Sequence, residues 1–231
     1  MKYILILIFC LIGFVIFYVY KEIQDQKLLR TATKVNRGTK SEQKMVLKLL
    51  KNGVKPKAIF HDLYLYIGNG NYCQIDLIVA TKVGMIVFEI KEYNGWILGN
   101  EKQQKWTQIL AYGKEKYHFY NPIHQNKKHI EDLKTFPQFE NIPFFSVIVF
   151  FGSCELKSFY NLPERTFLSK SSLIIEIFNE ILQNNEIINY KSKWDIFNLL
   201  DKAKKNGDDS KIIKQHKEYI NKLKLRYKYF N

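Results

Sequence analysis

Three charged residues, Asp76, Glu89 and Lys91, stand in or beside the apolar runs of the stretch from Asp76 to Lys91. Two apolar runs in this stretch are separated by a turn at Lys82-Val83-Gly84, and the pattern predicts two buried strands. Asp76 lies in the first run, while Glu89 and Lys91 lie at the end of the second. Burying a charged group is costly unless it is paired or bound to a metal ion. These strands are therefore expected to hold a polar site.

The types and spacing of these residues suit chemistry on phosphate esters. Glu89 and Lys91 are two residues apart, so on a strand their side chains lie on one face. Two carboxylates on neighbouring strands form a hard-oxygen site of the kind that Mg²⁺ or Mn²⁺ prefers. Such an ion can hold a scissile phosphate and generate hydroxide, and a nearby lysine can stabilise the developing negative charge. The pattern by itself occurs by chance in many strands, and its burial is what makes it informative.

The flanking sequence predicts an α/β domain in the order helix, three strands, helix, strand. The two helices are expected to run from Gly38-Thr39 to about Lys51 and from Asn121-Pro122 to about Phe136. The strands are expected at residues 58–66, 73–81, 84–91 and 143–151, the last a continuous apolar run typical of a central strand. Shorter strands at residues 95–98, 105–110 and 116–120 are expected to extend the three-strand meander.

Glu42 has two interpretations. It lies three residues before Met45 and seven before Leu49, which places it on the apolar side of the first helix. On that side it would face the strands that bear Asp76 and Glu89. Alternatively, Glu42 is a first-turn carboxylate that complements the helix dipole. The periodicity of the helix does not separate these two interpretations.

Residues 3–20 are apolar apart from Gly13 and, at about 1.5 Å per residue, are long enough to cross a bilayer as a helix. They predict a single-pass membrane anchor. A cleaved signal peptide is the alternative, but the run is longer than usual and no small-x-small cleavage site follows it closely. Only Lys2 precedes the run and several Lys and Arg residues follow it, so the rest of the chain is expected on the cytoplasmic side of the cell membrane. Residues 21–37 are expected to be a juxtamembrane tether or a helical continuation.

The chain has 231 residues and a formal net charge of +14. Its length suits one sizeable α/β domain with additions. The positive charge fits a polyanionic partner, either nucleic acid or an anionic membrane surface, although a lysine-rich solvated surface would also produce it. Residues 151–231 are expected to be a mostly helical, basic extension, with helices at about 171–183 and 194–205. The segment from Lys202 onward is expected to be a basic helix that is solvated or contacts nucleic acid or anionic lipid.

Several classes of enzyme lack support because their signatures are missing. The sequence contains no GxxxxGK[ST] phosphate loop, no GxSxG nucleophile elbow and no HExxH zinc motif. Its three cysteines and five histidines show no metal-ligand spacing, and the cysteines indicate reduced thiols. Among the histidines, His124 and His129 are of interest only because they lie close to Gln125.

An ordered set of segments extends the pattern beyond the three charged residues. The set comprises Gly38–Glu42, His61–Leu63, Gln74–Asp76, Val87–Lys91, Tyr93–Gly99, Trp106 and Asn121–Gln125. In these segments the chain resembles the nuclease-related domain (NERD) family of the PD-(D/E)XK nuclease-like superfamily, over about residues 38–150. The resemblance implies a restriction-endonuclease-like core, which has the element order predicted above. Lys40-Ser41 stands where a second glycine is common in the family, and this departure leaves the entry geometry of the first helix open.

The resemblance also implies roles for the site residues. Asp76 and Glu89 would bind the Mg²⁺ or Mn²⁺ ion, with the backbone carbonyl of Ile90 as a third ligand. Lys91 would be the catalytic lysine, and Gln125 would contact a metal-bound water or the substrate phosphate.

Glu42 would approach this implied site from its flank. The implied function is that of a membrane-anchored, metal-dependent nuclease that hydrolyses DNA phosphodiester bonds. A membrane anchor before such a domain is a common architecture in the family. The alternative is a non-catalytic module of the same fold that binds DNA or RNA at the membrane.

Overall fold

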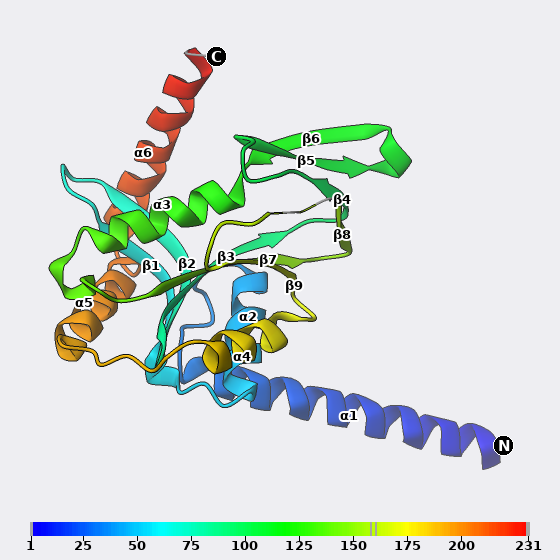
Figure 1. The fold of residues 1–231 in the computed structure, drawn as a ribbon. Helices are drawn as coiled ribbons and strands as arrows, with labels where there is room; N and C mark the ends of the chain where they lie inside the picture. Colours follow the sequence, from blue (N-terminus) through cyan, green and yellow to red (C-terminus); the bar gives the residue numbers. More distant parts are fainter. Residues whose placement is uncertain (1, 158, 160, 230–231) are drawn as a thin grey trace.

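The structure, a computed structural model, describes residues 2–157, 159 and 161–229. Its centre is a five-stranded mixed sheet in the order β1-β2-β3-β7-β9 (Figure 1). The strands are β1 (Ile59–Tyr66), β2 (Tyr72–Thr81), β3 (Gly84–Glu92), β7 (Phe144–Phe151) and β9 (Thr166–Lys170). The first three form an antiparallel meander, and β7 and β9 run parallel to β3. The predicted nuclease-like α/β core, with its order of helix, three strands, helix and strand, is confirmed.

Helices cover both faces of this sheet because successive residues of a strand point to opposite sides. Ile86 and Phe88 of β3 pack in one apolar cluster with α2 (Lys40–Lys51) and α4 (Ile174–Asn184). Met85 and Val87 pack in a second cluster with α3 (Pro122–Lys134) and α5 (Lys193–Asn206). Burial on both sides explains why β3 and β7 are apolar without alternation. Three short 3-10 turns, η1 (Pro56–Ala58), η2 (Ala111–Gly113) and η3 (Pro137–Phe139), complete the described connections.

A second sheet lies beside the first, in the order β6-β5-β4-β8 (Figure 1). Its strands are β4 (Gly95–Leu98), β5 (Lys105–Leu110), β6 (Glu115–Tyr120) and β8 (Cys154–Lys157). The prediction that the short strands extend the first meander was wrong, because the chain turns away at Gly95. There φ is +76°, and any side chain would meet the carbonyl oxygen of Ile109. Trp106 of β5 is fully buried and stacks on Phe150 of β7, so the two sheets share one apolar junction.

The chain after residue 150 packs onto the core rather than standing apart. The predicted helices are present as α4 and α5, and a basic helix, α6 (Ser210–Tyr229), follows them. Ile196 and Leu200 of α5 are buried in the same cluster as β1 and α3. Two strands in this region, β8 and β9, were not predicted. Residues 230 and 231 of the predicted basic tail lie outside the described residues.

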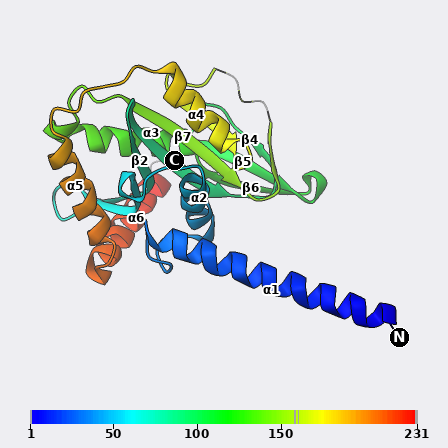
Figure 2. The ribbon, with the colours of Figure 1, turned by 90° about the horizontal axis from the view of Figure 1, so that it is seen from below.

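The N-terminal helix α1 (Lys2–Arg30) projects from the domain as one continuous rod (Figures 1 and 2). Its segment Ile6–Arg30 is long and apolar enough to cross a membrane, and the most apolar part is not buried by protein. The helix continues ten residues beyond the predicted anchor, so the first part of the predicted tether is helical. Leu29 and Ala32 are buried in the core, and Lys51 Nζ lies 2.6 Å from Asp25 Oδ2. The end of α1 is therefore part of the domain.

Candidate active site

The predicted site lies where β2 and β3 separate. Their antiparallel pairing ends at Leu77 opposite Phe88, so Asp76 and Glu89 occupy the first position beyond the ladder. Asp76 Oδ2 accepts a hydrogen bond from the backbone N–H of Ile90 at 2.7 Å. A carboxylate thus replaces the next backbone bond between the two strands. The opening brings buried polar atoms together at the end of an otherwise apolar pair of strands.

Glu89 and Lys91 lie on the face of β3 that α3 covers. Lys91 Nζ is 2.5 Å from Glu89 Oε1 and donates a hydrogen bond to Gln125 Oε1 at 3.0 Å. Gln125 reaches this position because the Asn121 side chain caps α3 and Pro122 occupies its first turn. The structure therefore brings three of the predicted site residues, from two elements, into direct contact.

The electrostatics of the site show an excess of negative charge around Asp76. Burial raises the pKa of Asp76 well above its ordinary value, and the charges of Glu89 and Glu42 raise it further against the opposing effect of Lys91. Burial would also raise the pKa of Glu89, but Lys91 and His129 lower it overall. The pKa of Lys91 is raised, because Glu89 and Asp76 outweigh the effect of its burial. Glu89 and Lys91 therefore form an ionised pair, and no cation among the described residues makes an ion pair with Asp76.

Both interpretations of Glu42 are correct at once. Thr39 and Glu42 form a capping box: the backbone N–H of Glu42 donates to Thr39 Oγ1, and that of Thr39 donates to Glu42 Oε1, each at 3.2 Å. Glu42 is nevertheless buried, and its Oε2 lies 3.2 Å from Nε2 of the fully buried His61. The carboxylate caps the helix with one oxygen and turns the other toward the strands.

The donor atoms fit a small divalent cation that keeps several waters. Among the described residues, no group of three or more His, Cys, Asp or Glu could hold a metal ion, so protein side chains alone do not enclose one. The buried Oε2 of Glu89, however, has no hydrogen-bond partner within the described part of the chain. The N–H of Ile90 points toward Asp76, and the carbonyl of a strand residue points to the same side as its N–H. Asp76, Glu89 and the Ile90 carbonyl together offer the oxygen ligands that Mg²⁺ or Mn²⁺ prefers.

Sequence reasoning missed the contribution of His129 and Cys73. His129 Nε2 lies 3.4 Å from Glu89 Oε2, as an ion-pair contact without hydrogen-bond geometry, and His129 Nδ1 lies 2.9 Å from Cys73 Sγ. Burial would lower the pKa of His129, but Cys73 and Glu89 raise it well above its ordinary value. The helical spacing could have indicated this contact, because His129 is four residues after Gln125 and shares its face of α3.

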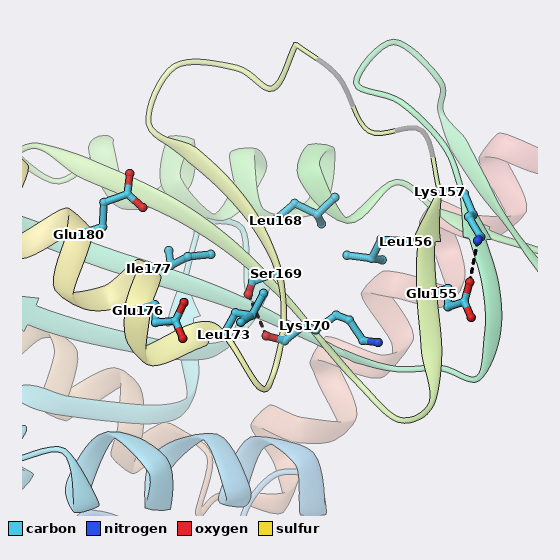
Figure 3. A pocket seen from close by; sticks show the side chains of 10 residues that line it. All are labelled: Glu155, Leu156, Lys157, Leu168, Ser169, Lys170, Leu173, Glu176, Ile177 and Glu180. Atoms are coloured by element: carbon cyan, nitrogen blue, oxygen red, sulfur yellow. Dashed lines mark hydrogen bonds and ion pairs between the residues drawn. The ribbon is translucent and has the colours of Figure 1, made fainter.

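A pocket lies away from these residues, between β8, β9 and α4 (Figure 3). Its volume is about 510 Å³, and it is open to solvent. Its lining includes the apolar side chains of Leu156, Leu168 and Ile177 and the charged side chains of Lys157 and Lys170. None of the predicted site residues lines it.

Comparisons with known proteins bear on the family of the chain. The profile of the nuclease-related domain family matches residues 37–151, which span α2 through β7. An uncharacterized protein of Bacillus anthracis is 31% identical over 186 residues, which cover 78% of this chain and 82% of that protein. No solved structure matches the chain. The matched segment and this relative together show that the chain belongs to the nuclease-related domain family.

Proposed function

We propose that this protein is a membrane-anchored nuclease that hydrolyses DNA phosphodiester bonds with Mg²⁺ or Mn²⁺. One observation carries the proposal: two buried carboxylates and a lysine converge where β2 and β3 separate. A purely structural strand pair would have little reason to bury Asp76 without a cation beside two other acidic groups. Membership of a nuclease-related family supports the same reaction class.

In this proposal each residue has a defined task. Asp76, Glu89 and the Ile90 carbonyl would hold the ion, which when bound supplies charge neutralisation at the phosphate and an acidified water. Lys91 would donate hydrogen bonds to the oxygen on which negative charge develops. Gln125 would hold the Lys91 ammonium in place through the 3.0 Å contact, and could exchange that contact for the substrate phosphate.

The proposed location of the reaction is the cytoplasmic surface of the cell membrane. α1 is the proposed anchor, and the net charge of +14 supports attraction of a polyanion to the domain. Exposed lysines at positions 211, 214 and 217 of α6 are candidates for contact with nucleic-acid phosphates or anionic lipid headgroups.

The test is cleavage of plasmid DNA by the full chain in detergent micelles. Activity is expected with Mg²⁺ or Mn²⁺, and none with EDTA. Lys91→Ala is expected to lower the cleavage rate by about 10²–10³-fold, the typical effect of removing one group that stabilises developing charge. Lys82→Ala is the matched control, because Lys82 is an exposed lysine at the other end of the same strand pair. Equal rates for Lys91→Ala and Lys82→Ala would refute the assignment of the catalytic lysine.

A non-catalytic nucleic-acid-binding module is the second candidate. The observation in its favour is that Lys91 already pairs with Glu89, and no three-residue metal cluster exists among the described residues. This module would bind DNA or RNA in a salt-sensitive way without cleaving it. Replacing Lys211, Lys214 and Lys217 by Gln would then flatten the salt dependence, by about 0.9 in slope for each lost contact to duplex DNA. Substitution is used here instead of removing the basic segment from Lys202 onward, because that truncation would also remove a buried part of α5.

A further inference from the structure

The segment between α1 and α2 contains a buried arginine, at the end of the stretch expected to be a juxtamembrane tether or a helical continuation. Arg37 Nε donates to Asp62 Oδ2 at 2.7 Å, and Nη2 donates to the carbonyl oxygen of Asp62. Nη1 donates to the carbonyl oxygen of Lys204 and to Asp208 Oδ1, each at 3.0 Å. Arg37 therefore joins β1 to the C-terminal end of α5 and the turn that follows it.

The residue that Arg37 holds, Asp62, has an unusual backbone. Its φ is +53°, a left-handed conformation that costs a residue with a side chain about 1–2 kcal/mol. The pairing of β1 with β2 passes from His61 opposite Leu77 directly to Leu63 opposite Ile75. The missing pair would be Asp62 with Asp76. Arg37 thus fixes a turned peptide at the same level of the sheet as the candidate metal ligand.

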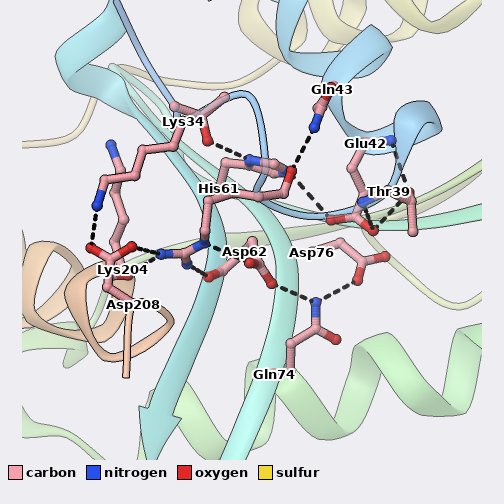
Figure 4. Close-up of polar contacts among 12 residues, drawn as sticks. Lys34, Thr39, Glu42, Gln43, His61, Asp62, Gln74, Asp76, Lys204 and Asp208 are labelled. Carbon is pink, nitrogen blue, oxygen red and sulfur yellow. Dashed lines mark hydrogen bonds and ion pairs between the residues drawn. The ribbon is translucent and has the colours of Figure 1, made fainter. Parts of the chain in front are cut away.

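Gln74 connects this turned peptide to the active site. Its Nε2 lies 3.3 Å from Asp62 Oδ1 and 3.2 Å from Asp76 Oδ1 (Figure 4). An amide group has two N–H donors, so Gln74 can serve both carboxylates at once. Asp76 is therefore held at both oxygens, by Gln74 on one side and by the N–H of Ile90 on the other.

We propose that Arg37, Asp62 and Gln74 are positioning residues that hold Asp76 in its metal-binding orientation. The inference rests on the proposed function only in treating Asp76 as a metal ligand. Groups that hydrogen-bond to a ligand carboxylate fix its orientation and commonly change metal affinity by about 10–100-fold when replaced. The turn at residues 204–208, which lies beyond the segment matched by the family profile, is then part of the active-site support.

A similar chain of contacts holds the carboxylate of Glu42. Thr33 Oγ1 lies 2.7 Å from His61 Nδ1, and His61 Nε2 lies 3.2 Å from Glu42 Oε2. Residues between α1 and α2 therefore reach both sides of the site.

The test uses the full chain in micelles and two matched pairs of variants. Gln74→Leu removes the bridging amide, while Gln108→Leu removes an amide that donates to the carbonyl of Asn94 at 2.8 Å, beside the second sheet. Arg37→Gln removes the hydrogen bonds that the guanidinium donates to Asp62. Lys34→Gln breaks a 2.9 Å ion pair to Asp208, which is also a partner of Arg37, and leaves the contacts of Asp62 in place. Each variant is measured in two ways: the NMR resonance of the Ile90 amide without metal, and Mn²⁺ affinity by calorimetry.

The Ile90 amide is the direct reporter because it donates to Asp76. We expect Gln74→Leu and Arg37→Gln to move its resonance and to weaken Mn²⁺ binding by about 10-fold or more, with both controls unchanged. The same resonance and affinity in Gln74→Leu as in Gln108→Leu would overturn the proposal, even if Arg37→Gln fails to fold. If the wild type binds no Mn²⁺ but the resonance moves only in the two test variants, the positioning is upheld and the metal-dependent function falls.

Discussion

Gly38→Ala is expected to lower the free energy of unfolding for two reasons, the backbone conformation at this position and the close contacts of a new methyl group. Gly38 lies just before α2 at φ +63°, so alanine there would occupy the left-handed region at a cost of about 1–2 kcal/mol. Its new methyl group would also fall inside 3.0 Å of Glu42 Oε2 and His61 Nε2. Both groups are buried and hydrogen-bonded, so they cannot move without loss. Overpacking of this kind costs about 1–3 kcal/mol more.

Gly53→Ala is the matched control for this prediction. Gly53 follows α2 at φ +83°, but nothing lies within 4 Å of the position of a side chain. The backbone cost and the lower entropy of the unfolded chain are shared, so they cancel in the comparison. Gly38→Ala should therefore lose about 1–3 kcal/mol more in the free energy of unfolding, measured by urea denaturation of the full chain in micelles. Equal losses in the two variants would refute the close contact of Gly38 with Glu42 and His61.

Three further predictions concern metal, the second sheet and pH. Mn²⁺ at a hundredfold excess over its Kd should stabilise the wild type by about 2.7 kcal/mol in thermal unfolding, and should not stabilise Asp76→Ala. Trp106→Ala should cost about 3–5 kcal/mol, because the ring is fully buried between the sheets, whereas Trp96→Ala, at an exposed ring, should cost much less. Lys34 and Arg37 lower the pKa of Asp208 below 3.8, so its contribution is present above that value and is lost as pH falls through the lowered pKa. Asp208→Asn should therefore be less stable than wild type at neutral pH, and the difference in urea denaturation should disappear in acid.

The elements that could be predicted from sequence are those whose pattern is local. The buried strands β2, β3 and β7 are long apolar runs, and the predicted bounds of each differ from the observed ones by one residue at one end. β8 and β9 have four and five residues and contain lysine, and they become strands only by pairing with β4 and β7. Such pairing depends on distant contacts that no short window of sequence contains.

The candidate site shows the same division. Glu89 and Lys91 were predicted to share a face because strand periodicity requires it, and their 2.5 Å contact agrees. The burial of Arg37 had no local sign, since its partners Asp62 and Asp208 are 25 and 171 positions away. A lone arginine in a polar segment is ordinarily exposed. Only the folded chain shows that Arg37 is paired.

The unbroken course of α1 into the domain affects how a substrate could be found. A flexible linker would let a tethered domain sample a hemisphere above the bilayer. The segment from Tyr20 to Arg30 is helical, rises about 15 Å, and ends among buried core residues, so no hinge is present within it. With α1 in a bilayer, the domain would keep a nearly constant height and would move mainly by rotating about the helix axis and diffusing in the plane. Encounter with DNA would then be a two-dimensional search, limited to molecules that already lie close to the membrane.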